Sequence, residues 1–141
     1  MKKINGLSKK MTIKELQKES YQIAKDKGWH DEGKDKSPLE YHMLMVSEIA
    51  EATEEVRNRK PPLYKNYEEP RFKPQIILPD NPEWNGYYQA AKLEGELAEL
   101  SDVVIRIADY CEHMGFDLEE AIKLKTEYNK SRTYRHGNKL L

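Results

Sequence analysis

Two long stretches of the chain carry apolar residues at intervals of three and four, the spacing that places side chains on one face of an α-helix. The first stretch is marked by Leu39, Met43, Val46, Ile49, Ala50 and Val56. The second is marked by Leu93, Leu97, Leu100, Val104, Ile107, Cys111 and Met114. This pattern predicts helices over about residues 38–59 and 90–114. Further apolar residues widen the face of the second helix, which indicates a central position in the fold.

Three polar residues, each followed three positions later by Glu, have the pattern of a helix N-terminus. Thr12 predicts a helix that runs to about Gly28, and Ser37 begins the helix of the first apolar stretch. Asp117 begins a last helix that runs from Leu118 to about Ser131. At the other ends, prolines stop the second helix and a glycine, Gly115, caps the third.

Residues 60–89 differ in composition from the rest, because six of the seven prolines and six aromatic residues lie there. We interpret this segment as an ordered insert loop, with one possible extended piece at residues 75–78. Residues 1–11 are interpreted as a basic tail. Since we find no strand pattern of any length, we expect an all-α fold: a single domain over residues 1–141, built as a four-helix bundle.

Composition narrows the classes of function. Charged residues make up 35% of the chain, yet the formal net charge is −1, which argues against wrapping a nucleic-acid polymer. The single cysteine excludes an intramolecular disulfide and an all-cysteine metal site, and it fits a reducing cytoplasm. No apolar run is long enough for a membrane span, and the first residues lack a secretory signal.

Two pairs of acidic residues fall within the apolar stretches, each pair three residues apart and therefore on one helix face. Glu48 and Glu51 form the first pair, and Glu99 and Asp102 form the second. If the two helices pack antiparallel, four carboxylates converge and repel one another unless a cation joins them. Oxygen-only ligands favour Mg²⁺, with Mn²⁺ as a possible substitute.

The alternative is that these carboxylates are solvated surface charges. E-x-x-E occurs often by chance in a chain this charged, and Glu51 to Glu54 is another copy of it. Motifs of histidine-containing metal bundles, of the P-loop and of the Gly-rich dinucleotide loop are missing. Two pairs on neighbouring long helices, with a basic C-terminal segment, favour a metal-bound polyphosphate.

The C-terminal segment offers groups that bind phosphate. Lys125, Asn129 and Arg132 lie on one face of the last helix, and Lys139 follows in the tail. The alternative is a solvated, basic helix end. Trp29, next to His30 between the first two helices, is either ordinary packing or a flat surface for a base.

These motifs, in this order, resemble those of MazG-like nucleotide pyrophosphohydrolases of the all-α NTP pyrophosphatase superfamily. The family pattern of E-x-x-E on one helix and E-x-x-D on the next reads here as Glu48 to Glu51 and Glu99 to Asp102. KGWHDE, SEIAEATEEVR and the ending KTEYNKSRTYRHGNK also look like the phage and bacterial branch. The resemblance covers about residues 21–139.

The resemblance implies Mg²⁺-dependent hydrolysis of a nucleoside triphosphate, (d)NTP, between its α- and β-phosphates, giving the monophosphate and pyrophosphate. It implies that the four carboxylates hold the metal and that Glu51 orients the attacking water. It assigns phosphate to Lys125, Asn129, Arg132 and Lys139, and the base more weakly to Trp29 and His30. It also implies a homodimer or homotetramer.

Two features depart from the family, namely the long Pro- and aromatic-rich insert and Ser101, which stands where alanine often precedes the Asp. We expect a role in house-cleaning or nucleotide-pool control. The alternatives are an enzyme like phosphoribosyl-ATP pyrophosphohydrolase and a non-catalytic bundle that binds a nucleotide or a protein partner.

Overall fold

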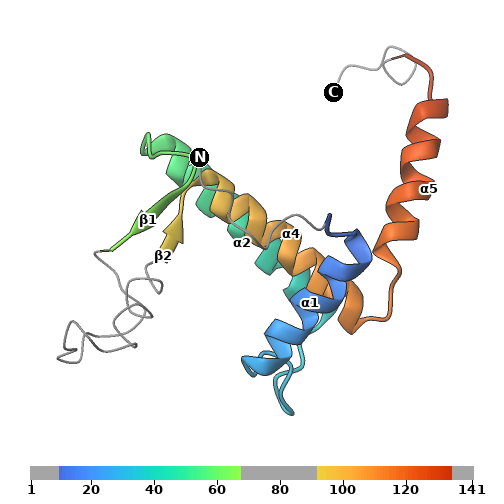
Figure 1. The fold of residues 1–141 in the computed structure, drawn as a ribbon, viewed down its shortest axis with the longest axis horizontal. Helices are drawn as coiled ribbons and strands as arrows, with labels where there is room; N and C mark the ends of the chain where they lie inside the picture. Colours follow the sequence, from blue (N-terminus) through green and yellow to red (C-terminus); the bar gives the residue numbers. More distant parts are fainter. Residues whose placement is uncertain (1–9, 68–91, 135–141) are drawn as a thin grey trace. The chain divides into compact units, whose positions relative to one another are not determined.

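The computed structural model describes residues 10–67 and 92–134. These residues form four helices and a two-stranded antiparallel sheet (Figure 1). In chain order the elements are α1 (Ile13–Asp26), α2 (Pro38–Arg57), β1 (Tyr64–Asn66), β2 (Lys92–Glu94), α4 (Glu96–His113) and α5 (Leu118–Ser131). The described part of the chain is therefore mostly helical with little strand, which agrees with the predicted all-α class.

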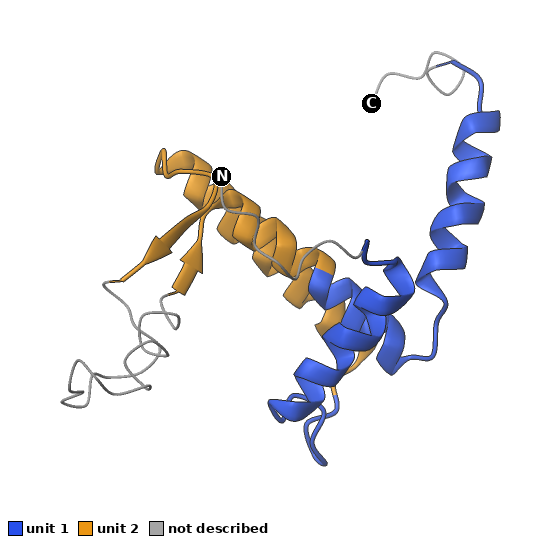
Figure 2. Ribbon diagram, viewed as in Figure 1, with its two compact units in different colours: residues 1–35, 105–141 blue, residues 36–104 orange. Residues whose placement is uncertain are grey.

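The chain divides into two compact units (Figure 2). Unit 1 comprises residues 1–35 and 105–141, and its described elements are α1, α5 and the C-terminal half of α4. Unit 2 comprises residues 36–104 and contains α2, the two strands and the N-terminal half of α4. No helix among the described residues is long and apolar enough to cross a membrane.

The helix N-termini confirm the predicted caps. The side chains of Thr12 and Ser37 each accept a hydrogen bond from a backbone N–H three residues on, and the Glu at that position bonds back to the cap. Asp117 accepts the N–H of Glu120 in the same way at α5. Each contact satisfies a donor that the first helical turn leaves without an intrahelical acceptor. Helix α5 spans the predicted residues.

Gly115 ends α4, as predicted. Its φ of 71° lies in the left-handed region that glycine adopts without strain. Its N–H donates to the carbonyl of Glu112, and the N–H of Phe116 donates to the carbonyl of Cys111. These two hydrogen bonds are those of a Schellman motif, which satisfies carbonyls at the helix end.

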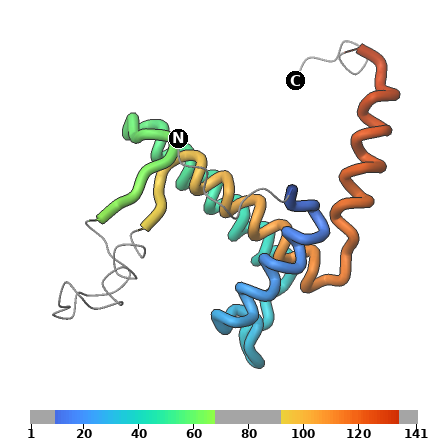
Figure 3. The backbone as a smooth tube through the Cα atoms, viewed as in Figure 1, coloured from blue at the N-terminus to red at the C-terminus, as the bar shows by residue number. Residues whose placement is uncertain are grey.

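The expectation that no strands occur, and that the third helix begins near Ala90, is wrong. Residues 92–94 pair antiparallel with residues 64–66, with Tyr64 opposite Glu94. A glycine with a φ of 112° then turns the chain into α4, which begins at Glu96 (Figure 3). Strands of three residues are too short to show an alternating pattern, and Leu93 matched the helical spacing although its backbone is extended. Part of the expected insert, residues 64–66, is thus strand; residues 68–89 and the possible extended piece lie outside the described residues.

The buried side-chain amide of Gln17 links the helices of unit 1 to one another. The side chain of Gln17 on α1 donates to Glu112 Oε2 at 2.8 Å and to the carbonyl of Phe116 at 2.6 Å. Its oxygen accepts the N–H of Leu118 at 3.2 Å. Gln17 is 6% exposed, so these hydrogen bonds replace water around a polar group inside unit 1. They connect α1 to the turn between α4 and α5.

Unit 2 buries a different kind of residue. Glu48 and Ala52 on α2 are buried, as are Ala98 and Glu99 on α4. On α2 the apolar residues that predicted the helix lie roughly on the opposite side from Glu48, and Met43 and Val46, for example, are 62% and 50% exposed. We define the open apolar stripes as Leu39, Met43 and Val46 on α2, with Leu97, Leu100 and Val104 on α4. The expectation of a central third helix therefore fails in unit 2, where its apolar face is exposed.

Candidate metal centre

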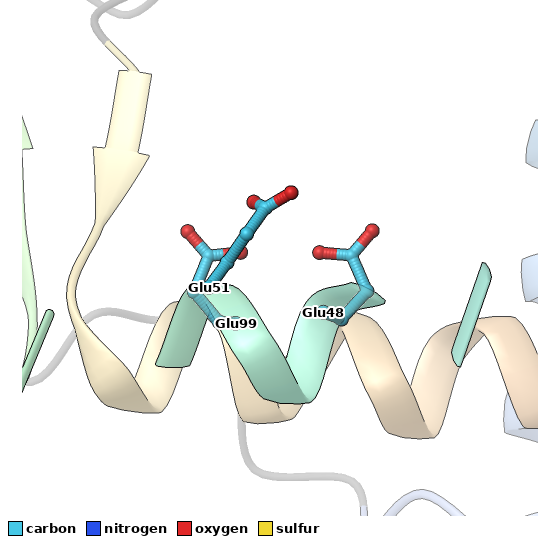
Figure 4. Close-up of side chains that lie close together, drawn as sticks. All are labelled: Glu48, Glu51 and Glu99. Carbon is cyan, nitrogen blue, oxygen red and sulfur yellow. The ribbon is translucent and has the colours of Figure 1, made fainter. Parts of the chain in front are cut away.

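Three carboxylates from two helices meet in unit 2. One oxygen each from Glu48, Glu51 and Glu99 lies within 4.8 Å of the others. Figure 4 shows the three side chains projecting to the same side of α2 and α4. It is the only group of its kind among the described residues. The predicted convergence of the two acidic motifs is therefore observed for three of the four carboxylates.

Local helix geometry explains the pair on α2. Glu48 and Glu51 are three residues apart and so differ by about 60° around the helix axis. Ala52 on α2 and Ala98 on α4 are both buried, as is Glu99. Glu48 and Glu99 are 6% and 7% exposed, whereas Glu51 is exposed. The site therefore has two enclosed carboxylates and one that solvent reaches.

Burial and the neighbouring carboxylates change the pKa of Glu99. The pKa of Glu99 is raised to about 7, first because burial penalises its charged form, then because it hydrogen-bonds Glu48 and faces other carboxylates. At neutral pH Glu99 thus retains part of its proton. Burial close to other carboxylates is costly for a charged carboxylate, and a proton or a cation relieves that cost.

The donor set fits a hard divalent cation. Carboxylate oxygens are the preferred protein ligands of Mg²⁺, whose octahedral shell of about 2.1 Å radius spans about 4.2 Å between opposite ligands. A group of oxygens within 4.8 Å of one another needs only small side-chain movements to meet that size. The set contains neither nitrogen nor sulfur, so it matches Mg²⁺ or Mn²⁺ better than zinc.

Asp102, the fourth predicted ligand, lies one turn beyond Glu99 on α4. It is exposed and is not part of the 4.8 Å group. Its charge still contributes to the raised pKa of Glu99. Asp102 is therefore near enough to act on the site by its charge, while its carboxylate is outside the described cluster.

The predicted phosphate ligands belong to unit 1. Lys125, Asn129 and Arg132 are all exposed, on α5 or at its C-cap, and α5 has no buried residue. The Lys125 Nζ lies 4.8 Å and the Arg132 guanidinium 5.7 Å from the centre of the Tyr128 ring. The sequence analysis missed Tyr128, although it falls between the two cations at helical spacing. Lys139 lies outside the described residues.

The two residues predicted for the base side have different surroundings, also in unit 1. Trp29 is 56% exposed. The His30 side chain is 6% exposed; its Nε2 is 2.7 Å from Asp109 Oδ1, and its ring stacks on His113 at 4.6 Å between centroids. Tyr21 lies 4.9 Å from the His30 ring. Asp109 and His113 were not singled out in the sequence, because their contact with His30 is long-range.

Comparison with protein-family models, curated proteins and solved structures finds no match to this chain.

Proposed function

We propose that this protein is a Mg²⁺-dependent nucleoside triphosphate pyrophosphohydrolase, which hydrolyses a (d)NTP between the α- and β-phosphates to (d)NMP and pyrophosphate. One observation carries the proposal: two enclosed carboxylates face a third across less than 4.8 Å, an arrangement that a divalent cation stabilises. The order of the acidic motifs and the basic C-terminal segment, which resemble those of MazG-like enzymes, add support. We also propose a role in house-cleaning or nucleotide-pool control.

In this proposal Glu48, Glu51, Glu99 and Asp102 hold Mg²⁺, with Mn²⁺ as a substitute. A cation held there would neutralise phosphate oxygens and would make the attacking water more acidic. Glu51, the exposed member of the group, accepts a hydrogen bond from the attacking water and orients it.

The sequence resemblance supports roles for further residues in binding the rest of the substrate. Lys125, Arg132 and Lys139 bind phosphate oxygens as cations, and Asn129 adds a neutral donor. The exposed Trp29 offers a flat apolar surface to the base. His30, held by Asp109, supports the segment that presents Trp29.

The test is a panel of ribo- and deoxynucleoside triphosphates incubated with Mg²⁺, with products resolved by anion exchange. We expect monophosphate and pyrophosphate, abolished by a chelator. Glu51→Gln and Asp102→Asn should lower kcat/KM at least about 100-fold, because each removes a charge that holds the metal or the water. Glu54→Gln is the matched control, since Glu54 is an exposed glutamate one turn further along α2.

Other outcomes would contradict the proposal. Wild-type turnover in Glu51→Gln would exclude this site from the reaction. If the enzyme hydrolysed phosphoribosyl-ATP and no nucleoside triphosphate, phosphoribosyl-ATP would be its substrate instead. Metal-dependent nucleotide binding with no product from any substrate would identify a binding module instead.

We further propose that a second copy of the chain covers the open apolar stripes, giving a homodimer, two of which can form a homotetramer. The stripes place six large apolar side chains at the surface of unit 2, each more than 40% exposed. Exposed apolar side chains of this size are typical of subunit interfaces. In this proposal a two-fold contact between copies buries the stripes.

Light scattering during size-exclusion chromatography tests the assembly. We expect wild type to have at least twice the chain mass of 16.6 kDa, and Val104→Glu to shift it toward the monomer. Ile23→Glu is the control, since Ile23 is equally exposed at 54% but lies on α1 in unit 1. A monomeric wild type, or a Val104→Glu variant of unchanged mass, would contradict this proposal.

A further inference from the structure

Hydrogen bonds from β1 and from the segment just before it reach both helices that carry the carboxylates. Just before β1, the carbonyl of Pro62 accepts the N–H of Leu97 in the first turn of α4 at 2.8 Å. The fit is close, because a Cβ on Gly95 would lie only 2.5 Å from the Pro62 oxygen. No residue other than glycine is accommodated there without moving the backbone. The start of α4 is thus held against the chain that enters β1.

A tyrosine makes the corresponding attachment to α2. The hydroxyl of Tyr64 on β1 donates to Glu55 Oε2 at 3.0 Å. Glu55 follows Glu51 by four residues, so it lies on the same side of α2, one turn further on. The sequence analysis did not single out either partner, since their contact depends on the path of the chain after α2.

Pairing between β1 and β2 also fixes the backbone of Tyr64. Tyr64 lies opposite Glu94 in the sheet. Glu94 accepts hydrogen bonds from Lys92 Nζ and Asn66 Nδ2, both at 2.8 Å, and these contacts lower its pKa. The carboxylate of Glu94 therefore stays ionised beside the tyrosine.

The Tyr64 hydroxyl keeps its proton in this setting. Its partial burial, the hydrogen bond to Glu55 and the nearby carboxylates raise its pKa to about 12. It is consequently a hydrogen-bond donor throughout the neutral and moderately alkaline range. Such a donor between two carboxylates is a stable contact for fixing one element to another.

We propose that Tyr64 is a positioning residue of the carboxylate site. By bonding Glu55, it fixes α2 to the segment whose Pro62 is bonded to α4, and so it sets the turn of Glu51 against the turn of Glu99. The inference rests on the proposed metal site. The Tyr64 hydroxyl does not touch the three carboxylate ligands and acts on them only through the backbones of α2 and α4.

The position of the contact makes this role specific. Glu51 and Glu55 share one side of α2, so a rotation or slide of α2 that breaks the Tyr64–Glu55 bond also moves Glu51 away from Glu99. Metal sites are sensitive to such shifts, because ligands must be held to within about 0.5 Å of their working geometry.

The test compares Tyr64→Phe with wild type by Mn²⁺ titration, followed by electron paramagnetic resonance of the free ion, and by Mg²⁺-dependent turnover. Tyr64→Phe keeps the ring and removes only the hydroxyl. We expect Mn²⁺ affinity to fall about tenfold, as for other residues that orient metal ligands. The Mg²⁺ concentration for half-maximal activity should rise by a similar factor, with turnover recovering at high Mg²⁺. Tyr67→Phe is the control, because Tyr67 is 57% exposed nearby.

A second pair of variants tests the other partner. Glu55→Gln keeps an oxygen that accepts the Tyr64 hydrogen bond, whereas Glu55→Leu removes it. We expect Glu55→Gln to bind Mn²⁺ nearly as wild type does and Glu55→Leu to resemble Tyr64→Phe. A role in stability alone would lower the unfolding temperature without changing Mn²⁺ affinity. Should Tyr64→Phe fail to fold, the Glu55 pair decides by the same measure.

The outcomes separate this inference from the proposed function. Wild type that binds no Mn²⁺ overturns both. Wild type that binds Mn²⁺, with Tyr64→Phe and Glu55→Leu binding within twofold of it, overturns the positioning role and leaves the metal site standing. If Glu55→Gln and Glu55→Leu lose Mn²⁺ affinity equally, the hydrogen bond from Tyr64 is not the cause of the loss.

Discussion

The apolar face of α4 is more exposed in its first half, in unit 2, than in the middle of its second half, in unit 1. Leu97 and Val104, in the first half, are each 51% exposed, whereas Ala108 and Cys111, in the second, are 0% and 8% exposed. In the first half the buried face carries Glu99 instead. The same sequence pattern on a single helix thus has two different outcomes.

The difference shows where function departs from the usual distribution of polar and apolar residues. Unit 1 follows the common rule, with aromatic and small residues inside and its buried Gln17 fully hydrogen-bonded. Unit 2 encloses carboxylates instead. Exposed aliphatic side chains occur in both units, as Ile23 and Leu124 of unit 1 show. We interpret the enclosed charges by the proposed cation, and the open apolar stripes of unit 2 by the proposed second copy.

The largest expected contrast is between truncations in the two halves of α4. Tyr110→Ala removes a buried ring that contacts Phe116 edge-on, and should lower the free energy of unfolding by about 3–4 kcal/mol. Leu100→Ala removes a side chain that is 41% exposed and should cost less than about 1 kcal/mol in the isolated chain. Urea unfolding at low protein concentration measures both. Equal costs would mean that the two halves are not packed differently.

The enclosed charge in unit 2 gives a pH dependence in metal-free protein. Because the folded-state pKa of Glu99 is raised from 4.5 to about 7, the folded state binds more protons than the unfolded state between these values. Stability from this group is therefore greatest at low pH and falls by up to about 3 kcal/mol as pH rises through 7.

Glu99→Gln should remove this loss. With a chelator present, we expect the variant to be more stable than wild type at pH 8 and the difference to shrink below pH 5. Thermal unfolding across this pH range is the measurement, with Glu54→Gln as the control for an exposed glutamate. A variant less stable than wild type at pH 8 would show that the Glu99 charge is not costly.

The buried amide of unit 1 provides the next contrast. Gln17→Ala leaves the N–H of Leu118 and the carbonyl of Phe116 without their partner, and should lower the free energy of unfolding by about 2 kcal/mol. Gln22→Ala, which removes only an exposed hydrogen bond to Asp26 on the same helix, should change it by less than about 0.5 kcal/mol. Chemical denaturation distinguishes these values. If both variants lose less than about 0.5 kcal/mol, the hydrogen bonds of Gln17 do not stabilise unit 1.

The smallest expected effect is the loss of a helix N-cap, and we expect it to be the same in both units. Thr12→Ala in unit 1 and Ser37→Ala in unit 2 each remove an N-cap side chain, and each should cost about 1 kcal/mol. Substitution by Asp instead of Ala should restore most of the loss, because Asp also caps a helix. The shift in unfolding temperature measures both. A large difference between the units would show that the caps have roles beyond the local helix.

Much of the helical structure was predictable because it depends on neighbours in sequence. The caps at Thr12, Ser37 and Asp117 and the glycine at the end of α4 all act within one turn. The strands were not predictable, since residues 64–66 and 92–94 become extended by pairing with each other. Pairing between distant segments leaves no periodic signal when each has three residues.

The candidate site was predictable in its chemistry and only partly in its composition. E-x-x-E places Glu48 and Glu51 on one face of α2, and the same spacing relates Glu99 to Asp102 on α4. The structure brings three of these four within 4.8 Å and leaves Asp102 exposed. The contribution of Tyr64 and Glu55 could not be read from spacing, because it depends on how β1 passes α2.

By itself the sequence determined where most helices begin and end and which acidic residues share a helix face, because caps and i, i+3 spacing are local geometry. Only the tertiary structure decided which face of α2 and α4 turns inward. Periodicity marks a stripe of apolar residues, but burial depends on what meets each side of the helix. In unit 2 carboxylates of α2 and α4 come together and small residues of both helices are buried, whereas the apolar stripes are at the surface.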